Sequence, residues 1–104
     1  MKLLKKILYL TTLIVFAMSI YAQENEVVGL VKKENINQKE TLIFILDNNE
    51  KYEISGKLTS FIGSFYTNQK LKVLGKISRF SADEKKEKKL DGQIEIKEII
   101  VTIQ

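Results

Sequence analysis

The chain has 104 residues, no histidine and no cysteine, and it carries 17 basic against 13 acidic side chains. The two missing residue types exclude the commonest general base, a thiolate nucleophile, disulfide bonds and the usual transition-metal ligands. The formal charge of +4 includes Lys2, Lys5 and Lys6, which lie in an N-terminal segment without acidic residues. Without those three lysines, 14 basic residues remain against 13 acidic ones, and so nearly neutral a chain lacks the field that attracts phosphate backbones.

Residues 1–22 have the pattern of a secretory signal peptide. A basic start precedes an apolar run from Ile7 to Phe16, and small or apolar residues continue to Ala22. We therefore predict cleavage after Ala22, a single mature domain of residues 23–104, and a periplasmic or secreted protein. The alternative is an uncleaved anchor helix, but the stretch Ile7 to Tyr21 is shorter than the roughly 20 residues that cross a membrane.

The first strand is predicted over residues 26–33, where an apolar run surrounds Gly29 and ends at two lysines. The polar segment Glu34 to Lys39 follows and is predicted to be a loop. Thr41 to Leu46 is apolar at consecutive positions, which predicts a strand covered on both faces.

A hairpin is predicted next. Asp47 to Glu50 contains residues that tolerate positive φ and is predicted to be a tight turn. The same letters, Asp47, Asn49 and Glu50, are a weak calcium pattern, but they lack the spacing of a known calcium loop, and the turn explains them. Lys51 to Ser55 is predicted to be the returning strand, with Tyr52 and Ile54 on one face.

After Gly56 the apolar period changes from two to that of a helix. Leu58, Phe61, Ile62 and Phe65 stand at i, i+3, i+4 and i+7, which predicts a short helix that packs this stripe against the sheet. Gly63 lowers the intrinsic stability of that helix, so its formation should depend on packing.

Leu71 to Phe80 is the clearest strand of the chain, because Leu71, Val73 and Ile77 alternate with polar residues. Gly75 occupies the next inward position, which indicates a bend or a bulge. Both Gly29 and Gly75 fall mid-strand, as expected of neighbouring strands that bend together.

The run Ser81 to Gly92 is dominated by charges of both signs and is predicted to be a solvated, mobile hairpin loop rather than a ligand clamp. The last strand is predicted over residues 93–103. Its apolar side chains change parity after Ile96, which predicts either a bulge near Lys97 and Glu98 or a strand that is covered on both faces at its end.

Three strands, a short helix and two further strands follow the order of the OB-fold. The runs Tyr52 to Gly56, Leu58 to Phe65, Lys70 to Ile77 and Gly92 to Ile99 resemble small exported bacterial proteins with an OB-type barrel, mostly of unknown function. The resemblance covers most of residues 26–103 and implies a mainly β fold. The expected architecture is a five-stranded OB-fold-like Greek-key barrel with one short helix between strands 3 and 4.

The resemblance implies a ligand face around the second and third strands, bordered by the loops Glu34 to Lys39 and Ser81 to Gly92. An aromatic ring there would offer a stacking platform, and exposed cations of the 71–80 strand would add charge. The alternative for Phe44 and Tyr52 is that they pack in the core. The candidate ligand-binding residues are Phe44, Tyr52, Lys72, Lys76, Arg79 and Phe80.

No catalytic residues are predicted, and no cofactor or metal. Glu95 and Glu98 are the only carboxylate pair considered for glycoside chemistry, and they have the pattern of an exposed strand face. We expect a binding or adaptor module that meets an envelope protein or a glycan. An oligonucleotide-binding domain and a structural accessory without a ligand stay open as alternatives, although a nucleic-acid partner is disfavoured by the near-neutral charge.

Overall fold

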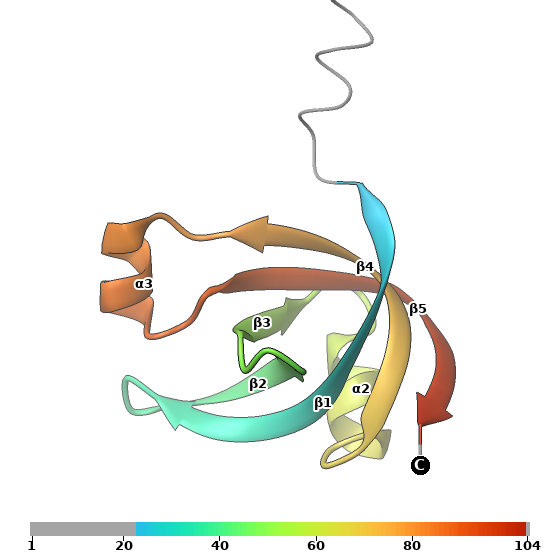
Figure 1. Ribbon diagram of the computed structural model, residues 1–104. Helices are drawn as coiled ribbons and strands as arrows, with labels where there is room; N and C mark the ends of the chain where they lie inside the picture. Colours follow the sequence, from blue (N-terminus) through green and yellow to red (C-terminus); the bar gives the residue numbers. More distant parts are fainter. Residues whose placement is uncertain (1–22, 104) are drawn as a thin grey trace, which may run out of the picture.

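Five strands and two short helices form the part of the chain that the computed structural model describes, residues 23–103 (Figure 1). The predicted signal peptide, residues 1–22, lies outside the described residues. In chain order the elements are β1 (Glu24–Ile36), β2 (Lys39–Leu46), β3 (Lys51–Ser55), α2 (Thr59–Phe65), β4 (Lys70–Arg79), α3 (Ala82–Lys88) and β5 (Gly92–Ile103).

The five strands form one sheet that closes on itself. Its order is β1-β2-β3-β5-β4, and β4 pairs back onto β1. Neighbouring strands are antiparallel except for β3 and β5, which run parallel. The mainly β architecture with five strands is therefore confirmed, as is a helix between the third and fourth strands. The prediction of one helix is wrong, because α3 adds a second helix between β4 and β5.

Strand β1 is longer, and its connection to β2 shorter, than predicted. β1 continues to Ile36, which pairs with Lys39, and only Asn37 and Gln38 form the turn, with φ of 51° and 66°. Two successive residues with positive φ suit the twist of a two-residue hairpin. The predicted loop from Glu34 to Lys39 is therefore wrong, because polar side chains on an outer strand face do not prevent backbone pairing.

The second hairpin agrees with its prediction. Ile43 and Phe44, on opposite faces of β2, are both fully buried, so this strand is covered on both sides. The turn at residues 47–50 is closed by the Leu46 amide, which donates to the Glu50 carbonyl at 2.9 Å, and Asn49 has φ of 70°. Tyr52 and Ile54 of β3 both face the core.

The core fills the space inside the closed sheet. Its buried members come from all five strands and from α2: Val31, Phe44, Tyr52, Ile54, Ile62, Leu71, Val73, Ile94 and Ile96. Two glycines admit this packing. A Cβ on Gly29 would lie 2.6 Å from the Phe44 ring, and a Cβ on Gly75 would lie 2.9 Å from Ile94 Cδ1. Gly29 and Gly75 lie on neighbouring strands, as predicted, and the β4–β5 register shifts between Leu74 and Gly75.

Helix α2 lies across one end of the sheet and packs only part of the predicted stripe against it (Figure 1). Ile62 is fully buried, and Leu58 and Tyr66, at the two ends of the helix, pack against the core. Phe61 and Phe65 are exposed, at 47% and 64%. The predicted stripe is therefore confirmed for Leu58 and Ile62 and wrong for Phe61 and Phe65, because the buried face follows a spacing of four residues and leaves these two rings on the flank.

Strand β5 contains two bulges. Leu74 pairs with Glu98 and Gly75 with Ile96, so Lys97 is an extra residue, which confirms the predicted bulge near Lys97 and Glu98. A second shift leaves Ile100 without a partner on β4, because Lys72 pairs with Val101 and Val73 with Ile99. This second bulge was not predicted. Its extra residue, Ile100, and the adjacent Val101 are both exposed, so the alternative of a strand end covered on both faces is wrong.

The close approach at Gly29 yields the first prediction. Gly29→Ala would force a Cβ against the Phe44 ring and to 2.9 Å from the Ile45 carbonyl oxygen, so we expect a loss of about 1–3 kcal/mol in the free energy of unfolding. Gly63→Ala is the matched control, because its Cβ would make an ordinary 3.4 Å contact with Leu42 within a helix, and it should gain about 0.5–1 kcal/mol. The free energy of unfolding of both variants would be measured by urea denaturation. Equal changes in the two variants would contradict the close packing at Gly29.

Candidate functional site

The predicted ligand face is bordered on one side by α3, which replaces the expected mobile loop. Ser81 caps this helix: its hydroxyl accepts from the Glu84 amide at 3.3 Å, and the Glu84 carboxylate accepts from the Ser81 amide at 3.3 Å. Lys89 ends the helix in the left-handed region, with φ of 60°. The segment predicted to be a mobile loop therefore contains a helix, so its predicted conformation is wrong. Residues 81–89 are exposed to solvent, as predicted. The Ser81-x-x-Glu84 capping box was the signal in the sequence that could have found the helix.

The segment that carries α3 is attached to the first three strands at two places. The Asn37 side-chain amide, in the β1–β2 turn, donates to the Glu87 carbonyl of α3 at 3.0 Å. Asp91 and Lys51 form a reciprocal pair: the Asp91 amide donates to the Lys51 carbonyl, and the Lys51 amide donates to the Asp91 carboxylate, both at 2.8 Å. The β1–β2 turn and α3 therefore lie at the same end of the molecule and are joined there (Figure 1).

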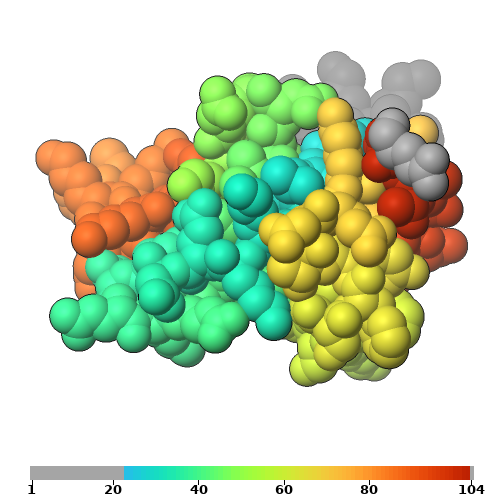
Figure 2. Space-filling model, turned by 90° about the horizontal axis from the view of Figure 1, so that it is seen from below, coloured from blue at the N-terminus to red at the C-terminus, as the bar shows by residue number. Residues whose placement is uncertain are grey.

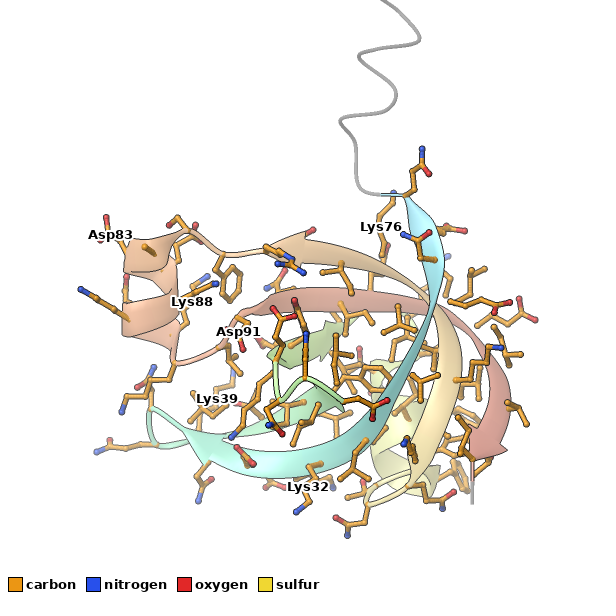
Figure 3. All side chains as sticks on the ribbon, viewed as in Figure 1. Lys32, Lys39, Lys76, Asp83, Lys88 and Asp91 are labelled. Atoms are coloured by element: carbon orange, nitrogen blue, oxygen red, sulfur yellow. The ribbon has the colours of Figure 1, made fainter. Side chains whose placement is uncertain are left out.

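A cavity of about 240 Å³ lies between this turn, β2, β3 and α3, and we call it the rim cavity. It is lined by Ile36, Asn37, Lys39, Thr41, Glu53, Lys88 and Leu90. Lys39 and Lys88 reach this end from β2 and α3 (Figure 3). Leu90 is only 6% exposed although it belongs to no part of the main core. The cavity is smaller than most small-molecule sites, so it suits one side chain or one sugar ring rather than an extended ligand.

The two candidate stacking rings are not on this face. Phe44 and Tyr52 are fully buried in the core, so neither ring presents a surface to a ligand. The stacking hypothesis is therefore corrected in favour of the alternative, core packing. The physical reason is the parity of the strands: both residues lie on the inner faces of β2 and β3, directly opposite each other in the register.

Only the Tyr52 hydroxyl reaches a polar group, the Glu50 carboxylate, to which it donates at 3.1 Å. Burial raises the pKa of the Tyr52 phenol, and the neighbouring Glu50 carboxylate raises it further. The hydrogen bond from the Asn48 side chain holds the pKa of Glu50 below its ordinary value, and the bond from Tyr52 acts in the same direction. This group closes the β2–β3 turn and makes a structural network.

The cationic candidates are divided between two regions. Lys72 and Lys76 project from the outer face of β4, where Lys72 forms an ion pair with Glu26 of β1 at 3.1 Å and Lys76 stands opposite Glu24 and Glu95. Figure 3 shows Lys76 well away from Lys39 and Lys88. Neither lysine lies on the face formed by β2 and β3, so the structure does not bring them into the predicted site.

Arg79 and Phe80, at the end of β4, do lie near the rim. Arg79 is 68% exposed and has its Nη2 3.7 Å from the Glu50 carboxylate. Phe80 is half-buried, and the Lys88 ammonium lies 4.6 Å from its ring centroid. The cation therefore already occupies a face that a stacked base or sugar would need. Of the six candidate residues, these two remain at the predicted border.

Many of the basic side chains among the described residues lie beside carboxylates. Half of the 14 basic residues in the range 23–104 form ion pairs: Lys33 with Glu40, Lys51 with Glu34, Lys70 with Asp47, Lys72 with Glu26, Arg79 with Glu50, Lys85 with Asp91 and Lys97 with Glu95. Such pairs add little to stability at the surface, but they remove the unbroken basic face that a phosphate backbone requires.

The exposed apolar surface lies elsewhere, on α2 and on the end of β5. Phe61 and Phe65 have ring centroids 5.0 Å apart and leave about half or more of their surface in water. Ile100 and Val101 are 42% and 49% exposed. Seen from below, the end of β5 in red lies at the margin of the molecule, with the start of β4 in yellow beside it (Figure 2). Sequence reasoning missed this surface, because it assigned the two phenylalanines to the core.

Other chemistry finds little support in the described part of the chain. No group of three acidic side chains within residues 23–103 could hold a metal ion. The helices among these residues, α2 and α3, lack the length and hydropathy of a membrane span. Comparison of the chain with protein-family models, with curated proteins and with solved structures gives no match.

The Glu50 network yields a pH prediction. Because its pKa in the folded state lies below the ordinary value of 4.5, Glu50 stabilises the fold at neutral pH, and this contribution is lost as the pH falls through the lowered pKa. Glu50→Gln should therefore be less stable than the natural chain at pH 7, and the difference should shrink at acid pH.

The measurement is urea unfolding of both proteins across this pH range. Glu98→Gln is the matched control, because Glu98 is exposed and its carboxylate forms no ion pair with the other described residues. A stability difference for Glu50→Gln that stays constant from neutral to acid pH would contradict the network.

Proposed function

We propose that this chain is a small exported binding or adaptor module, built on an OB-type Greek-key barrel, and that its partner is an envelope protein. The strand order β1-β2-β3-β5-β4, the parallel pair of β3 and β5, and the position of α2 between β3 and β4 support the OB-type assignment. The signal-peptide pattern of residues 1–22 supports export.

The observation that carries the choice of a protein partner is the exposure of Phe61, Phe65, Ile100 and Val101. Two of them, Phe61 and Phe65, lie side by side with ring centroids 5.0 Å apart. Adjacent exposed apolar side chains on a small domain mark interaction sites, and aromatic residues dominate the energy of protein interfaces. The molecule keeps these four in water although its core already accepts Leu58, Ile62 and Tyr66 from the same helical segment.

A glycan partner is favoured less by the geometry. Sugar rings stack on open aromatic faces, but Phe44 and Tyr52 are buried, and Lys88 lies over Phe80. A nucleic-acid partner would need unpaired cations on one face, whereas half of the basic residues lie beside carboxylates. We assign no catalytic role, since the chain has neither histidine nor cysteine to act as base or nucleophile.

The test is capture of the partner by the protein purified from the cells that export it, held by a C-terminal tag on a long flexible linker. We expect one protein to be retained through moderate salt and nuclease treatment. The double variant Phe61→Ser, Phe65→Ser should retain at least about tenfold less of it, since buried aromatic anchors at interfaces contribute about 2 kcal/mol or more.

The matched control is the double variant Lys39→Ser, Lys88→Ser at the rim cavity, which should retain the partner as the natural chain does. Both doubles change exposed residues and should fold, since surface substitutions cost within about 0.5 kcal/mol. Recovery that nuclease or a glycan competitor abolishes would contradict a protein partner. Capture of nothing in any condition would favour a structural accessory.

A further inference from the structure

Strand β5 has a stretch of edge that no other described strand uses. β5 pairs with β4 from Gly92 to Ile103, but it pairs with β3 only from Gly92 to Glu95. The chain leaves β3 after Ser55 through Gly56, whose φ of 98° suits glycine alone. Beyond Glu95, the edge of β5 that faces β3 therefore has no strand partner within residues 23–103. A longer β3 would have paired with this edge.

This open edge has the chemistry of a strand acceptor. In an edge strand, alternate backbone N–H and C=O groups point outward without partners. Its last part, Ile99 to Ile103, contains no charged residue and no proline, which are two of the devices that prevent pairing at an edge, although the bulge at Ile100 is a third. The bulge at Ile100 leaves two successive apolar side chains, Ile100 and Val101, about half in water.

The open edge begins at a cavity of about 250 Å³ between β5 and the start of α2. The cavity is lined by Lys57, Leu58, Glu95, Ile96 and Lys97. The Lys97 ammonium lies 2.8 Å from the Glu95 carboxylate, so these two charges compensate each other. Lys57 forms no direct ion pair with the other described residues. The hydrogen bond from Lys97 holds the pKa of Glu95 below its ordinary value, and the charge of Lys57 acts in the same direction. The three charged side chains that line the cavity, Lys57, Glu95 and Lys97, therefore carry one excess positive charge.

We propose that the β5 edge from Ile96 to Ile103 binds an extended segment of the partner protein as an added strand. Backbone groups of that segment would pair with β5, its apolar side chains would cover Ile100 and Val101, and an acidic group would meet Lys57. A strand is the one element that satisfies a row of unpaired backbone groups. This inference rests on the proposed function, since it names the part of an envelope protein that the module recognises.

A second copy of the chain fits the same edge less well. In an antiparallel pairing, the residues of a second copy that would face the Ile96 end belong to Ile99 to Ile103, which contains no acidic residue to place beside Lys57, and Glu98 would lie farther from it. A foreign segment with alternating apolar residues and a terminal acid complements both the backbone and the charge. We therefore assign the edge to a heterologous peptide and treat self-pairing as an outcome of the test.

The test uses synthetic peptides of about ten residues, the length of an ordinary strand. One alternates threonine and valine and begins with glutamate, a second begins with lysine, and a third is the first peptide with alternate backbone nitrogens methylated. Binding to the full chain, purified from envelope extract and isotopically labelled, is followed by NMR and by amide hydrogen exchange. We expect the glutamate peptide to bind, with shifts and slower exchange at residues 96–103.

Each comparison has a definite expectation. The methylated peptide should bind at least about tenfold more weakly, because it cannot form the ladder. The lysine peptide should bind about threefold more weakly than the glutamate peptide, and Lys57→Glu should reverse that preference, since an exposed ion pair is worth about 0.2–1 kcal/mol. Lys39→Glu, at the rim cavity, is the matched control and should leave the preference unchanged.

Three outcomes would overturn the inference: equal binding of the methylated and unmethylated peptides, shifts confined to residues outside 96–103, or protection of these amides that rises with protein concentration when no peptide is present. The last result would assign the edge to a second copy. Failure of the proposed function can be distinguished from failure of this inference. In that case the capture experiment would retain no envelope protein, although the peptides would still bind at β5.

Discussion

The closure of a five-stranded sheet without any disulfide is the constraint on which the rest of this structure depends. β4 returns to pair with β1, and β3 joins β5 in parallel, so five strands surround one small core. Curvature this tight brings side chains and neighbouring backbone close together. Glycine stands where Phe44 and Ile94 leave no space for a Cβ, at Gly29 and Gly75, and the two bulges of β5 supply further twist. Packing, rather than covalent linkage, therefore holds the fold together.

The same closure decides which surfaces are available for binding. β3 is short, so β5 continues past it with one edge open, and α2 fills only the end of the sheet. The bulge that helps β5 to bend also leaves the apolar side chains of Ile100 and Val101 exposed to solvent. On the opposite side, α3 and Leu90 fold onto the face that the OB-type analogy assigns to ligands and reduce it to the rim cavity. The binding surface that we propose thus follows from how the sheet closes.

Much of the strand architecture could be predicted, because alternation at Leu71, Val73 and Ile77, or consecutive apolar residues in β2, depends directly on burial. The parity change after Ile96 predicted a bulge correctly. The site was harder to predict. Phe61 and Phe65 fit a helical stripe as well as Leu58 and Tyr66 do, and only the placement of α2 in three dimensions decides between them. Helix α3 and the last residues of β1 were both predicted to be loops, because both segments are rich in polar and charged residues. Composition alone does not reveal the capping box that starts α3 or the two-residue turn that follows β1.

The central claim is that the exposed aromatic flank of α2 contacts a protein in the cell. Its most direct measurement is site-specific photo-cross-linking in intact cells, with a photoreactive phenylalanine analogue at position 65 and, as the comparison, at position 80 beside α3. The account predicts one discrete cross-linked envelope protein from position 65 and much less of it from position 80. No protein adduct at position 65, or equal labelling of the same protein from both positions, would contradict it.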